Sequence, residues 1–584
     1  MAKHNLDTIR HSTAHLMAQA ISRLFPEHHI QFGIGPVIDN GFYYDIEVDY
    51  RIKDEDLLKI EQKMLEIIEE KLPIERKVLS KKEALDYFEK EKQLLKVELI
   101  TSLPGSEEIS CYGQGEFTDL CRGPHVESTD QLPKYFKLLH IAGAYWRGSS
   151  DRQMLQRIYA ACFNDRKSLK KHLLFLEEAK KRDHRKLGKE LELFHFEQVA
   201  PGSPFFLPKG AFIYNELIEF MRRVYRKYDY KEVITPQILN SDLWHTSGHY
   251  ENYKDDMFFT NIEKGEFAVK PMNCPCHMLM FKHFHYSYRD LPLRYADFGR
   301  LHRNEKSGTL AGLTRVRTFC QDDAHVFLPL DSVQDEILSL LDMFFAVYKH
   351  FGFQDVKINL STRPEKKVGD DSTWDTAEDA LKKALDKSGH KYSIKEGDGA
   401  FYGPKIDIEI SDALQRYHQL GTIQLDFQLP DRFGLKFTNN KGEEERPVVI
   451  HRALLGSLER FFGIYLEHTG GAYPFWLSPV QAVIVPINND QHLEHCQKLA
   501  KDLKGLGLRI EIDDRNESMG FKTRQIQKSK VPFMLVFGDK EIEEGTASLR
   551  SYGAKGSSTL SLEELKEKFF ALDREKTPAK IREM

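Results

Sequence analysis

The chain has 584 residues, of which 41% are apolar, so it is long enough for three or four domains with sizeable hydrophobic cores. Lys and Arg total 84 against 89 Asp and Glu, and the net charge of −5 offers no overall attraction to nucleic acid. Seven cysteines without regular close spacing argue against a disulfide framework, and no apolar run approaches the roughly 20 residues that span a bilayer, so we predict a cytoplasmic protein without membrane contact.

Residues 1–163 are predicted to form a first domain that contains two short motifs with histidine. His11 and His15 lie four apart in a helical pattern, so both rings project from one face of the helix. A serine stands where the helix of a zinc protease needs glutamate, which removes that class of enzyme. Cys121 and His125 are also four apart, in a Gly-Pro context that favours a turn. A second metal site, a polar pocket that positions water, and chance spacing all stay open.

Residues 164–194 are predicted to form a helix that links two domains. Leucines keep a helical spacing there, and ten Lys or Arg accompany six Asp or Glu. The basic residues could follow an RNA backbone, and a solvated face with compensating charges is an equal alternative.

Residues 195–478 and 479–584 are predicted to form two further domains. The first opens with an amphipathic helix and a strand that ends at Pro236, where the missing proline N–H is harmless. Two later runs with period two, FYGPKIDIEI and HQLGTIQLDFQLP, are expected to add strands to an antiparallel sheet. No Gly-rich phosphate loop is present, which counts against kinase-like and dinucleotide-binding folds. After position 479, strand and helix alternate, which predicts an α/β domain with a largely parallel sheet.

Three residues in the 195–478 segment are candidate metal ligands: Cys274, His325 and His451. Zinc favours thiolate and imidazole ligands, and a site with three protein ligands keeps one position free for substrate. Spacing alone is weak support, because the three are far apart in a chain with 24 histidines and ordinary core residues are the alternative. The local patterns around PMNCPCHM, LHRNE and RVRTFCQDDAH indicate strand or turn.

The same stretches carry a family resemblance. LHRNE followed by RVRTFCQDDAH resembles motif 2 of the class II aminoacyl-tRNA synthetases, a strand, loop and strand, and GSLERFF resembles the helix of motif 3. NCPxH, QDDAH and IHRALLGSLER narrow the resemblance to the threonyl-tRNA synthetase family, over essentially the whole chain. The resemblance implies a multidomain α/β and α+β protein, with an α+β editing domain, a class II antiparallel sheet with helices, and a C-terminal α/β anticodon-binding domain.

The resemblance also implies a reaction and its partners. L-threonine would be activated by ATP to threonyl-adenylate and transferred to the 3′ end of tRNA(Thr). One zinc ion per subunit and Mg²⁺ with ATP are implied, as is a homodimer built by the helix and strand that resemble motif 1. The reaction asks little covalent chemistry of the protein, so positioning and charge stabilisation should carry most of the effect.

The residues implied for the synthetic site fall into three groups. The expected catalytic residues are Arg303, Arg460, His249 and Lys405. The expected ATP-binding residues are Arg303, Glu305, Arg315, Phe319, Gln424 and Arg460. The expected threonine-binding residues are Met272, Gln321, Asp323, Tyr402 and Gln419. Phe319, Gln321, Asp323 and His325 alternate, which places them on one face of a strand. His249 would act as an imidazole that titrates near neutrality, although a lone exposed histidine would look the same.

Two further sets follow from the resemblance. A pocket that hydrolyses mischarged tRNA, expected to be metal-free, would be lined by His11, His15, Lys96, Asp119, Cys121 and His125. Anticodon bases would meet Asn516, Glu541 and Arg550, for which ordinary surface residues are the alternative.

Threonine chemistry explains why two sites belong in one chain. A metal with an open position can be ligated by the amino group and β-hydroxyl of threonine, whereas valine presents a methyl, which supports discrimination of around 10⁴. Serine keeps both ligating groups and lacks only a methyl, worth about 10 to 200-fold. Hydrolytic editing of seryl-tRNA(Thr) is therefore expected.

The sequence departs from the family pattern at three places. Cys276 replaces the glycine of NCPGH, Cys320 replaces a threonine and receives no role, and the small domain that usually precedes His11 is expected to be missing. Two other kinds of protein are alternatives to an active synthetase. An RNA-binding relative without catalysis should have lost Arg303, Arg460 or a metal ligand, and a stand-alone hydrolase would not need residues 195–478.

Overall fold

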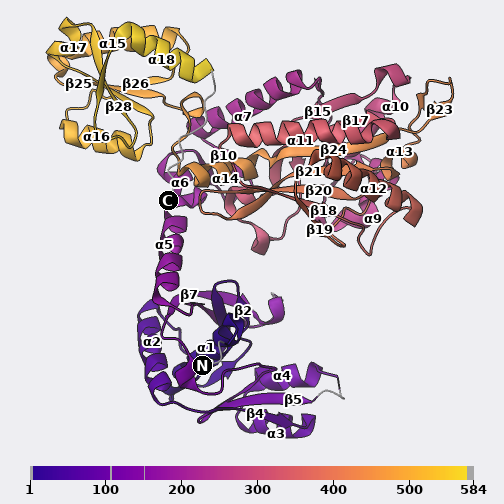
Figure 1. The fold of residues 1–584 in the computed structure, drawn as a ribbon, viewed down its shortest axis with the longest axis vertical. Coiled ribbons are helices and arrows are strands. Elements are labelled where there is room, and N and C mark those ends of the chain that lie inside the picture. Colours follow the sequence, from indigo (N-terminus) through magenta and orange to yellow (C-terminus); the bar gives the residue numbers. More distant parts are fainter. Residues whose placement is uncertain (1–3, 105–107, 150, 575–584) are drawn as a thin grey trace. The chain divides into compact units, whose positions relative to one another are not determined.

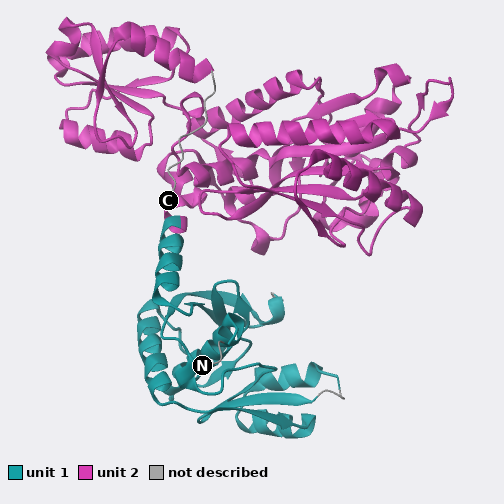
Figure 2. Cartoon of the chain, viewed as in Figure 1, with its two compact units in different colours: residues 1–178 teal, residues 179–584 magenta. Residues whose placement is uncertain are grey.

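The computed structural model describes residues 4–104, 108–149 and 151–574. The chain divides into two compact units, residues 1–178 and 179–584 (Figure 1, Figure 2). The division falls within helix α5 (Arg166–Arg182). None of the helices in the described part of the chain has both the length and the apolar composition that crossing a bilayer demands.

Unit 1 contains a five-stranded antiparallel sheet in the order β1-β3-β8-β7, with β2 paired to β3. Asn5 caps helix α1 by accepting the N–H of Asp7, so this helix starts just ahead of the two histidines. Helices α1 and α2 share one hydrophobic core with the sheet. These elements are α1 (Leu6–Leu24), α2 (Asp54–Glu69), β1 (Ile30–Phe32), β2 (Val37–Ile38), β3 (Gly41–Val48), β7 (Phe136–Tyr145) and β8 (Met154–Cys162).

A smaller antiparallel sheet of three strands completes unit 1. Its core packs two short helices on the strands. The last strand leads directly into Cys121, and the segment from there to His125 is neither helix nor strand. The elements are β4 (Ile74–Leu79), α3 (Lys81–Lys90), α4 (Leu94–Ser102), β5 (Ile109–Gln114) and β6 (Phe117–Leu120).

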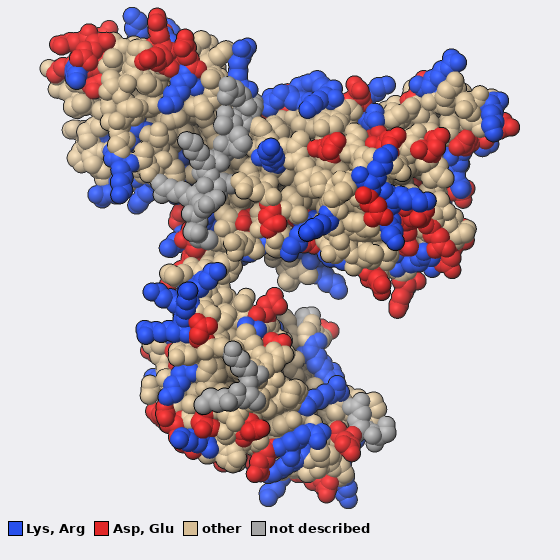
Figure 3. Space-filling view, viewed as in Figure 1, with Lys and Arg blue, Asp and Glu red and all other residues tan. Residues whose placement is uncertain are grey.

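The predicted single linker helix is wrong, because two helices occupy that stretch. Helix α5 ends at Arg182 and α6 (His184–Glu190) follows. Asp183 adopts an extended ψ of 122° and caps α6 through the N–H of Arg185, which breaks the run. None of the residues of α5 is buried, and Lys and Arg side chains gather along it on the visible face (Figure 3).

Unit 2 is built on a nine-stranded sheet in the order β11-β15-β17-β24-β21-β20-β18-β19, with β16 paired to β17. The central pairings are antiparallel, as predicted, and the outermost pairs β11/β15 and β18/β19 are parallel. The strands are β11 (Lys231–Glu232), β15 (Leu293–Asp297), β16 (Arg300–His302), β17 (Thr318–Leu328), β18 (Val356–Ser361), β19 (Tyr392–Lys395), β20 (Lys405–Ser411), β21 (Tyr417–Asp426) and β24 (Val448–Ser457).

Four long helices share the main core of unit 2 with this sheet: α7 (Pro208–Lys227), α11 (Val333–His350), α12 (Asp371–Ser388) and α14 (Leu458–Thr469). Ala324, Val326 and Leu328 of β17 belong to that core, whereas Phe327 belongs to a separate cluster with Cys274. The odd-numbered side chains of β17 therefore face away from the long helices, and this is the face that carries the candidate site.

The strand predicted to end at Pro236 is much shorter than expected. Strand β11 covers two residues at the sheet edge, after which the chain leaves to pair β12 with β14 in another sheet. The smaller elements of this part are β9 (Phe194–Phe196), β10 (Pro204–Phe206), β12 (Ile238–Asn240), α8 (Asp242–Ser247), α9 (His249–Tyr253), β13 (Phe258–Ile262), β14 (Gly265–Val269), α10 (Cys274–Lys282), α13 (Gln428–Arg432), β22 (Phe437–Thr438) and β23 (Glu444–Glu445).

The C-terminal part of unit 2 has a mixed sheet in the order β26-β25-β27-β28-β29, not the largely parallel one predicted. The β25/β26 and β25/β27 pairs are parallel, and the β27/β28 and β28/β29 pairs are antiparallel. The segment between β27 and β28 is shorter than the dozen or so residues that a crossover between parallel strands needs. The elements are β25 (Ala482–Pro486), α15 (Asn489–Gly505), β26 (Ile510–Ile512), α16 (Met519–Lys528), β27 (Phe533–Phe537), α17 (Asp539–Glu543), β28 (Thr546–Ser551), β29 (Ser558–Ser561) and α18 (Leu562–Arg574).

Candidate active site

The three predicted metal ligands lie together. One potential ligand atom from each of Cys274, His325 and His451 lies within 4.8 Å of the others, and all three residues are buried. Cys274 is the first residue of α10, so the prediction of strand or turn around it is wrong. Pro275 in the first helical turn explains the difference, since the missing proline N–H would have no helical partner there.

The histidines of this cluster each have one bonded and one unpartnered nitrogen. Nδ1 of His325 lies 2.8 Å from Nδ1 of His277, and Nε2 of His451 lies 2.8 Å from Oδ2 of Asp426. Nε2 of His325 and Nδ1 of His451 are buried without a hydrogen-bond partner among the described residues. Metal-ligating histidines typically have this arrangement, with the second nitrogen fixed by a neighbour. The residues present therefore fit a metal ion bound by one sulfur and two nitrogens.

Burial also sets the protonation of these ligands. It raises the pKa of the Cys274 thiol and lowers the pKa of the His325 imidazole, each well away from its ordinary value. Both groups are neutral without a cation nearby. A bound divalent cation would favour the thiolate, which is the form that binds metal.

The cluster forms part of a row that crosses the sheet. Tyr295, His325, His451, Gln424 and Lys405 are register partners in turn on β15, β17, β24, β21 and β20. Directly opposite residues share one face of an antiparallel sheet. Antiparallel register therefore brings together residues that are far apart in the sequence.

The predicted threonine-binding residues Asp323 and Tyr402 lie beside this row. Oδ2 of Asp323 accepts a hydrogen bond from Nδ2 of Asn273 at 3.0 Å, and burial raises the pKa of the Asp323 carboxyl. The Tyr402 hydroxyl donates to Oε1 of Gln424, and its ring centroid lies 5.2 Å from that of His451. Met272 packs, partly buried, against the hydrophobic cluster that contains Cys274, and Gln321 is half-buried.

Lys405 and Gln419 meet at one carboxylate. Nζ of Lys405 lies 3.0 Å from Oδ2 of Asp407, and Nε2 of Gln419 donates to its Oδ1 at 2.7 Å. The Lys405 side chain is only 16% exposed, so it is held in this ion pair and is not simply solvated.

The arginines of the motif 2 and motif 3 stretches lie around the β16–β17 connection. The guanidinium of Arg303 lies 5.0 Å from the ring centroid of Phe319, and Nε of Arg315 donates to Glu305 at 2.9 Å. From α14, Arg460 donates through Nε to the carbonyl of Gln419 and through Nη1 to that of Thr314, both at 3.2 Å. Ser457 caps α14 by accepting the N–H of Arg460.

His249 differs from the expected imidazole that titrates near neutrality. It is fully buried, and burial, with smaller effects of His451 and Arg432, lowers its pKa to about 3. Nδ1 lies 2.8 Å from the Ser247 hydroxyl, and Nε2 is unpartnered within the described chain. His249 is therefore a neutral imidazole with one nitrogen available.

Sequence reasoning missed Asp322, which holds a bulge in the strand next to β17. On β24 the register shifts between Ala453 and Ser457, which makes a bulge opposite β17. The Asp322 carboxylate fills the bulge by accepting the N–H groups of Leu454 and Leu455, both at 2.9 Å, next to the buried guanidinium of Arg452. Sequence reasoning also missed His277, Asn273 and Asp426. Only His277 and Asn273 had a sequence signal, because they belong to the NCPCH motif.

Unit 1 brings its own predicted cluster together. Potential ligand atoms of His11, His15, Cys121 and His125 lie within 4.8 Å of one another. The Cys121 sulfur is 3.1 Å from Nε2 of both His11 and His125. Burial raises the pKa of Cys121 to about 12 and lowers the pKa of His125 to about 2, so the cluster is uncharged near neutral pH.

A buried ion pair adjoins the unit 1 cluster. Nζ of Lys96 lies 2.5 Å from Oδ1 of Asp119, whose Oδ2 accepts from the Tyr44 hydroxyl and lies 3.5 Å from Nε2 of His15. The pair opens on a pocket between α4 and β6 that is also lined by aromatic rings such as Phe117. All six predicted residues of this set therefore lie together, and Tyr44 is an addition that the sequence did not signal.

The three predicted anticodon residues do not line one common hollow. Arg550 lines a hollow with residues of α16 and β27, and neither Asn516 nor Glu541 lines it. Asn516 is exposed, and Glu541 accepts the N–H of Gly538 at the start of α17, which is a capping contact.

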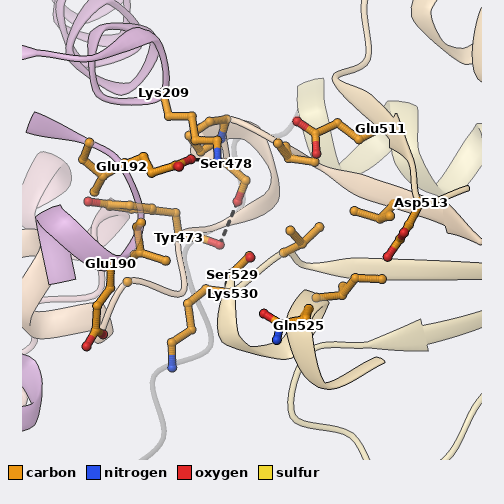
Figure 4. A pocket seen from close by; sticks show the side chains of 18 of the residues that line it. Glu190, Glu192, Lys209, Tyr473, Ser478, Glu511, Asp513, Gln525, Ser529 and Lys530 are labelled. Atoms are coloured by element: carbon orange, nitrogen blue, oxygen red, sulfur yellow. Dashed lines mark hydrogen bonds and ion pairs between the residues drawn. The ribbon is translucent and has the colours of Figure 1, made fainter. Parts of the chain in front are cut away.

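Another hollow in unit 2 is lined by residues of several segments, among them Lys209, Tyr473 and Asp513 (Figure 4). Lys209 pairs with Glu192 at 2.8 Å, and Arg515 pairs with Asp513 at 2.7 Å. None of the predicted site residues lines this hollow. Because its charges are largely paired with one another, we assign the chemistry to the sheet face.

Family comparisons agree with this arrangement. The class II core domain of tRNA synthetases for G, H, P, S and T matches residues 253–469, and an anticodon-binding domain matches 481–572. The second additional domain of threonyl and alanyl tRNA synthetases matches 109–159. The fold and the site therefore define a class II aminoacyl-tRNA synthetase.

Similar proteins of known name identify the family within this class of synthetases. The chain is 49% identical to threonine–tRNA ligase 2 of Bacillus subtilis, over 97% of this chain and 88% of the relative. It is 50% identical to the threonine–tRNA ligase of Carboxydothermus hydrogenoformans, over 98% and 89%. The chain belongs to the threonine–tRNA ligase family.

Two solved structures of threonyl-tRNA synthetases are similar to this chain. The RNA binding domain of threonyl-tRNA synthetase from Cryptosporidium parvum is 47% identical with a TM-score of 0.65, covering 68% of this chain and 99% of that one. A putative threonyl-tRNA synthetase from Aeropyrum pernix is 31% identical with a TM-score of 0.60, covering 68% and 98%.

Proposed function

We propose that this chain activates L-threonine with ATP and transfers the threonyl group to tRNA(Thr), and that Cys274, His325 and His451 hold a zinc ion that selects the substrate. The observation that carries the proposal is a pair of buried histidine nitrogens, without a partner in the part of the chain that the structure describes, beside a buried thiol. When bound, zinc would offer an open position to the amino group and hydroxyl of threonine. Valine has no hydroxyl to place there.

The neighbouring residues have positioning roles in this proposal. Asp323, which Asn273 holds in place, accepts a hydrogen bond from the substrate hydroxyl. Tyr402 packs beside His451 and forms a wall of the pocket. Met272, Gln321 and Gln419 line the threonine side.

Charge on the nucleotide side comes from arginine. Arg303 and Arg460 stabilise the charge that develops on the α-phosphate of ATP, which arrives with Mg²⁺, because a guanidinium fork binds phosphate oxygens in pairs. Lys405 adds a nearby positive charge and His249 assists transfer to the tRNA. The remaining nucleotide contacts are proposed for Glu305, Arg315, Phe319 and Gln424.

The direct test is amino-acid-dependent ATP–pyrophosphate exchange. We expect kcat/KM for threonine to exceed that for valine by about 10⁴ and that for serine by about 10 to 200-fold. Exchange with threonine should disappear in Arg460→Ala. Equal exchange with threonine and valine would contradict the proposal.

The unit 1 cluster supports a second activity, the hydrolysis of seryl-tRNA(Thr). His11, His15, Cys121 and His125 form a neutral group of potential donors and acceptors next to the Lys96–Asp119 pair. Such a group can orient a water molecule toward an ester without a metal ion. Serine needs this second step because the synthetic site rejects it weakly.

Further parts of the proposal concern organisation. We assign editing to residues 1–163, linkage to 164–194, synthesis to 195–478 and anticodon binding to 479–584, with Arg550 as its best-placed residue. A homodimer is supported by the short edge strand β11 and the neighbouring Ile234, which is 90% exposed. Seven free cysteines support a reducing, cytoplasmic location.

A further inference from the structure

His184, the first residue of α6, bridges two parts of unit 2. Its side chain is 6% exposed. Nδ1 lies 2.6 Å from Oε1 of Glu467 on α14, and the N–H of Leu313 donates to Nε2 at 3.0 Å. Leu313 belongs to the loop between β16 and β17. One buried ring therefore joins a helix and a loop that are far apart in the sequence.

The hydrogen bonds assign the tautomer of His184. Because a backbone N–H only donates, Nε2 must accept and carries no proton. The proton therefore sits on Nδ1 and is donated to the Glu467 carboxylate. A side chain at this position must accept at one end and donate at the other to keep both bonds.

The loop is shaped to receive the ring. Gly312 has a φ of +56°, and a Cβ there would lie 2.2 Å from Nε2 of His184, so only glycine allows this approach. The N–H of Ala311 donates to the carbonyl of Arg315 at 3.2 Å, which closes the loop on itself. The 311–315 loop is closed by its own backbone hydrogen bond, and the bond from Leu313 attaches the closed loop to His184.

The two ends of the bridge carry proposed nucleotide-binding arginines. Arg315 lies at the end of the loop, and Arg460 lies on α14, the same helix as Glu467. Nη1 of Arg460 donates to the carbonyl of Thr314 at 3.2 Å, so the loop and the arginine also touch directly. Movement of the loop would displace the Arg315 guanidinium and break the contact between Arg460 and Thr314.

A metal role does not explain His184. Asp183, His184 and Glu467 could together surround an ion. However, both ring nitrogens of His184 already have hydrogen-bond partners, and Asp183 is occupied as the cap of α6. His184 therefore connects α14 to the 311–315 loop through two hydrogen bonds.

We propose that His184 is a positioning residue that holds the 311–315 loop against α14 and so fixes the separation of Arg315 and Arg460 for ATP. This inference rests on the proposed nucleotide role of the two arginines. His184 itself lies in the segment that connects unit 2 to α5, which makes the connecting segment part of the nucleotide site.

Two near-isosteric variants distinguish the bond to Leu313 from the bond to Glu467. In His184→Gln, Oε1 can replace Nε2 as acceptor for the loop, whereas in His184→Asn the amide can replace only the contact with Glu467. We expect Asn and Ala at position 184 to raise the Kd and KM for ATP about 10-fold, because a buried N–H loses its partner. Gln should raise them less than about threefold, and the KM for threonine should stay within about twofold in all three.

Asp183→Ala is the matched control, since it removes the cap of α6 and leaves the Leu313 bond in place. We expect normal ATP binding in this control. Equal ATP defects in the Gln and Ala variants, or a parallel rise in the KM for threonine, would overturn the inference, because general loosening would produce both. ATP binding by Arg460→Ala, measured in parallel, distinguishes a failure of the proposed function from a failure of the inference about His184. If it binds ATP normally, the proposed function fails; if it alone is defective and His184→Asn is normal, only this inference fails.

Discussion

His325 and His451 face each other across β17 and β24, with ring centroids 4.5 Å apart and ring planes at 79°. Each has one nitrogen bonded to a neighbour, His277 or Asp426, and one nitrogen near Cys274 that no other described residue bonds. The pair is thus oriented for a ligand by residues that are not themselves ligands. The predictions below follow from this orientation and from the groups around it.

Asp426→Asn should weaken metal binding about 10 to 100-fold. The aspartate holds the proton of His451 on Nε2, which leaves Nδ1 free to ligate. An asparagine amide that turns its NH₂ to Nε2 would force the proton onto Nδ1. Competition with a chromophoric chelator measures the affinity. Asp431→Asn, an exposed carboxylate of α13, is the control, and equal affinities in the two variants would contradict the role of Asp426.

Arg460→Lys should raise the KM for ATP about 10 to 100-fold and leave the KM for threonine near normal. Lysine keeps the charge but cannot bond the carbonyls of Gln419 and Thr314 while also reaching phosphate. Steady-state ATP–pyrophosphate exchange gives both constants. Arg226→Lys on the surface of α7 should behave as wild type. A lysine variant with unchanged ATP kinetics would exclude the fork geometry as the cause.

His249 should stay a neutral imidazole over the whole working range. Its pKa of about 3 in the folded chain lies below the ordinary value of 6.5, so the unfolded chain binds the extra proton between these values. Stability from this group is therefore complete above pH 6.5 and is lost as the pH falls toward 3. Single-turnover transfer to tRNA should show no inflection near 6.5, and His249→Asn should slow transfer about 100-fold without changing the profile. An inflection at 6.5 that this variant removes would refute the assignment.

His11→Ala should slow hydrolysis of seryl-tRNA(Thr) about 100-fold and leave threonine-dependent exchange unchanged. Nε2 of His11 contacts the Cys121 sulfur in unit 1, and none of the proposed synthetic residues lies in that unit. His28→Ala is the control, since this histidine pairs with Asp49 at the surface. Deacylation of purified seryl-tRNA(Thr) is the measurement. Comparable rates in the two variants would remove His11 from the editing site.

Local patterns predicted much of the fold and the candidate site. The period of two in QDDAH places Asp323 and His325 on the same face of β17, and the four-residue spacing places His11 and His15 on one face of α1. These arguments need only the geometry of one element. They succeed wherever a motif lies within a single helix or strand.

Other features depend on pairing between distant segments, which sequence alone does not give. The bond between His451 and Asp426 depends on how β24 lies against β21, and the Asp322 contacts depend on a bulge in β24. The start of α10 at Cys274, where strand or turn is predicted, has a local signal in Pro275 of the first helical turn. The low pKa of His249 follows from burial, which only the fold determines.

The most direct measurement of the central claim is the zinc content per chain of purified protein, compared with the variants Cys274→Ala and Cys276→Ala. The two cysteines lie in the same helical turn, and only the first belongs to the three-residue cluster. We expect about one zinc ion per chain in wild type and in Cys276→Ala, and almost none in Cys274→Ala. Full zinc content in Cys274→Ala, or none in the wild type, would contradict the metal centre on which the selection of threonine depends.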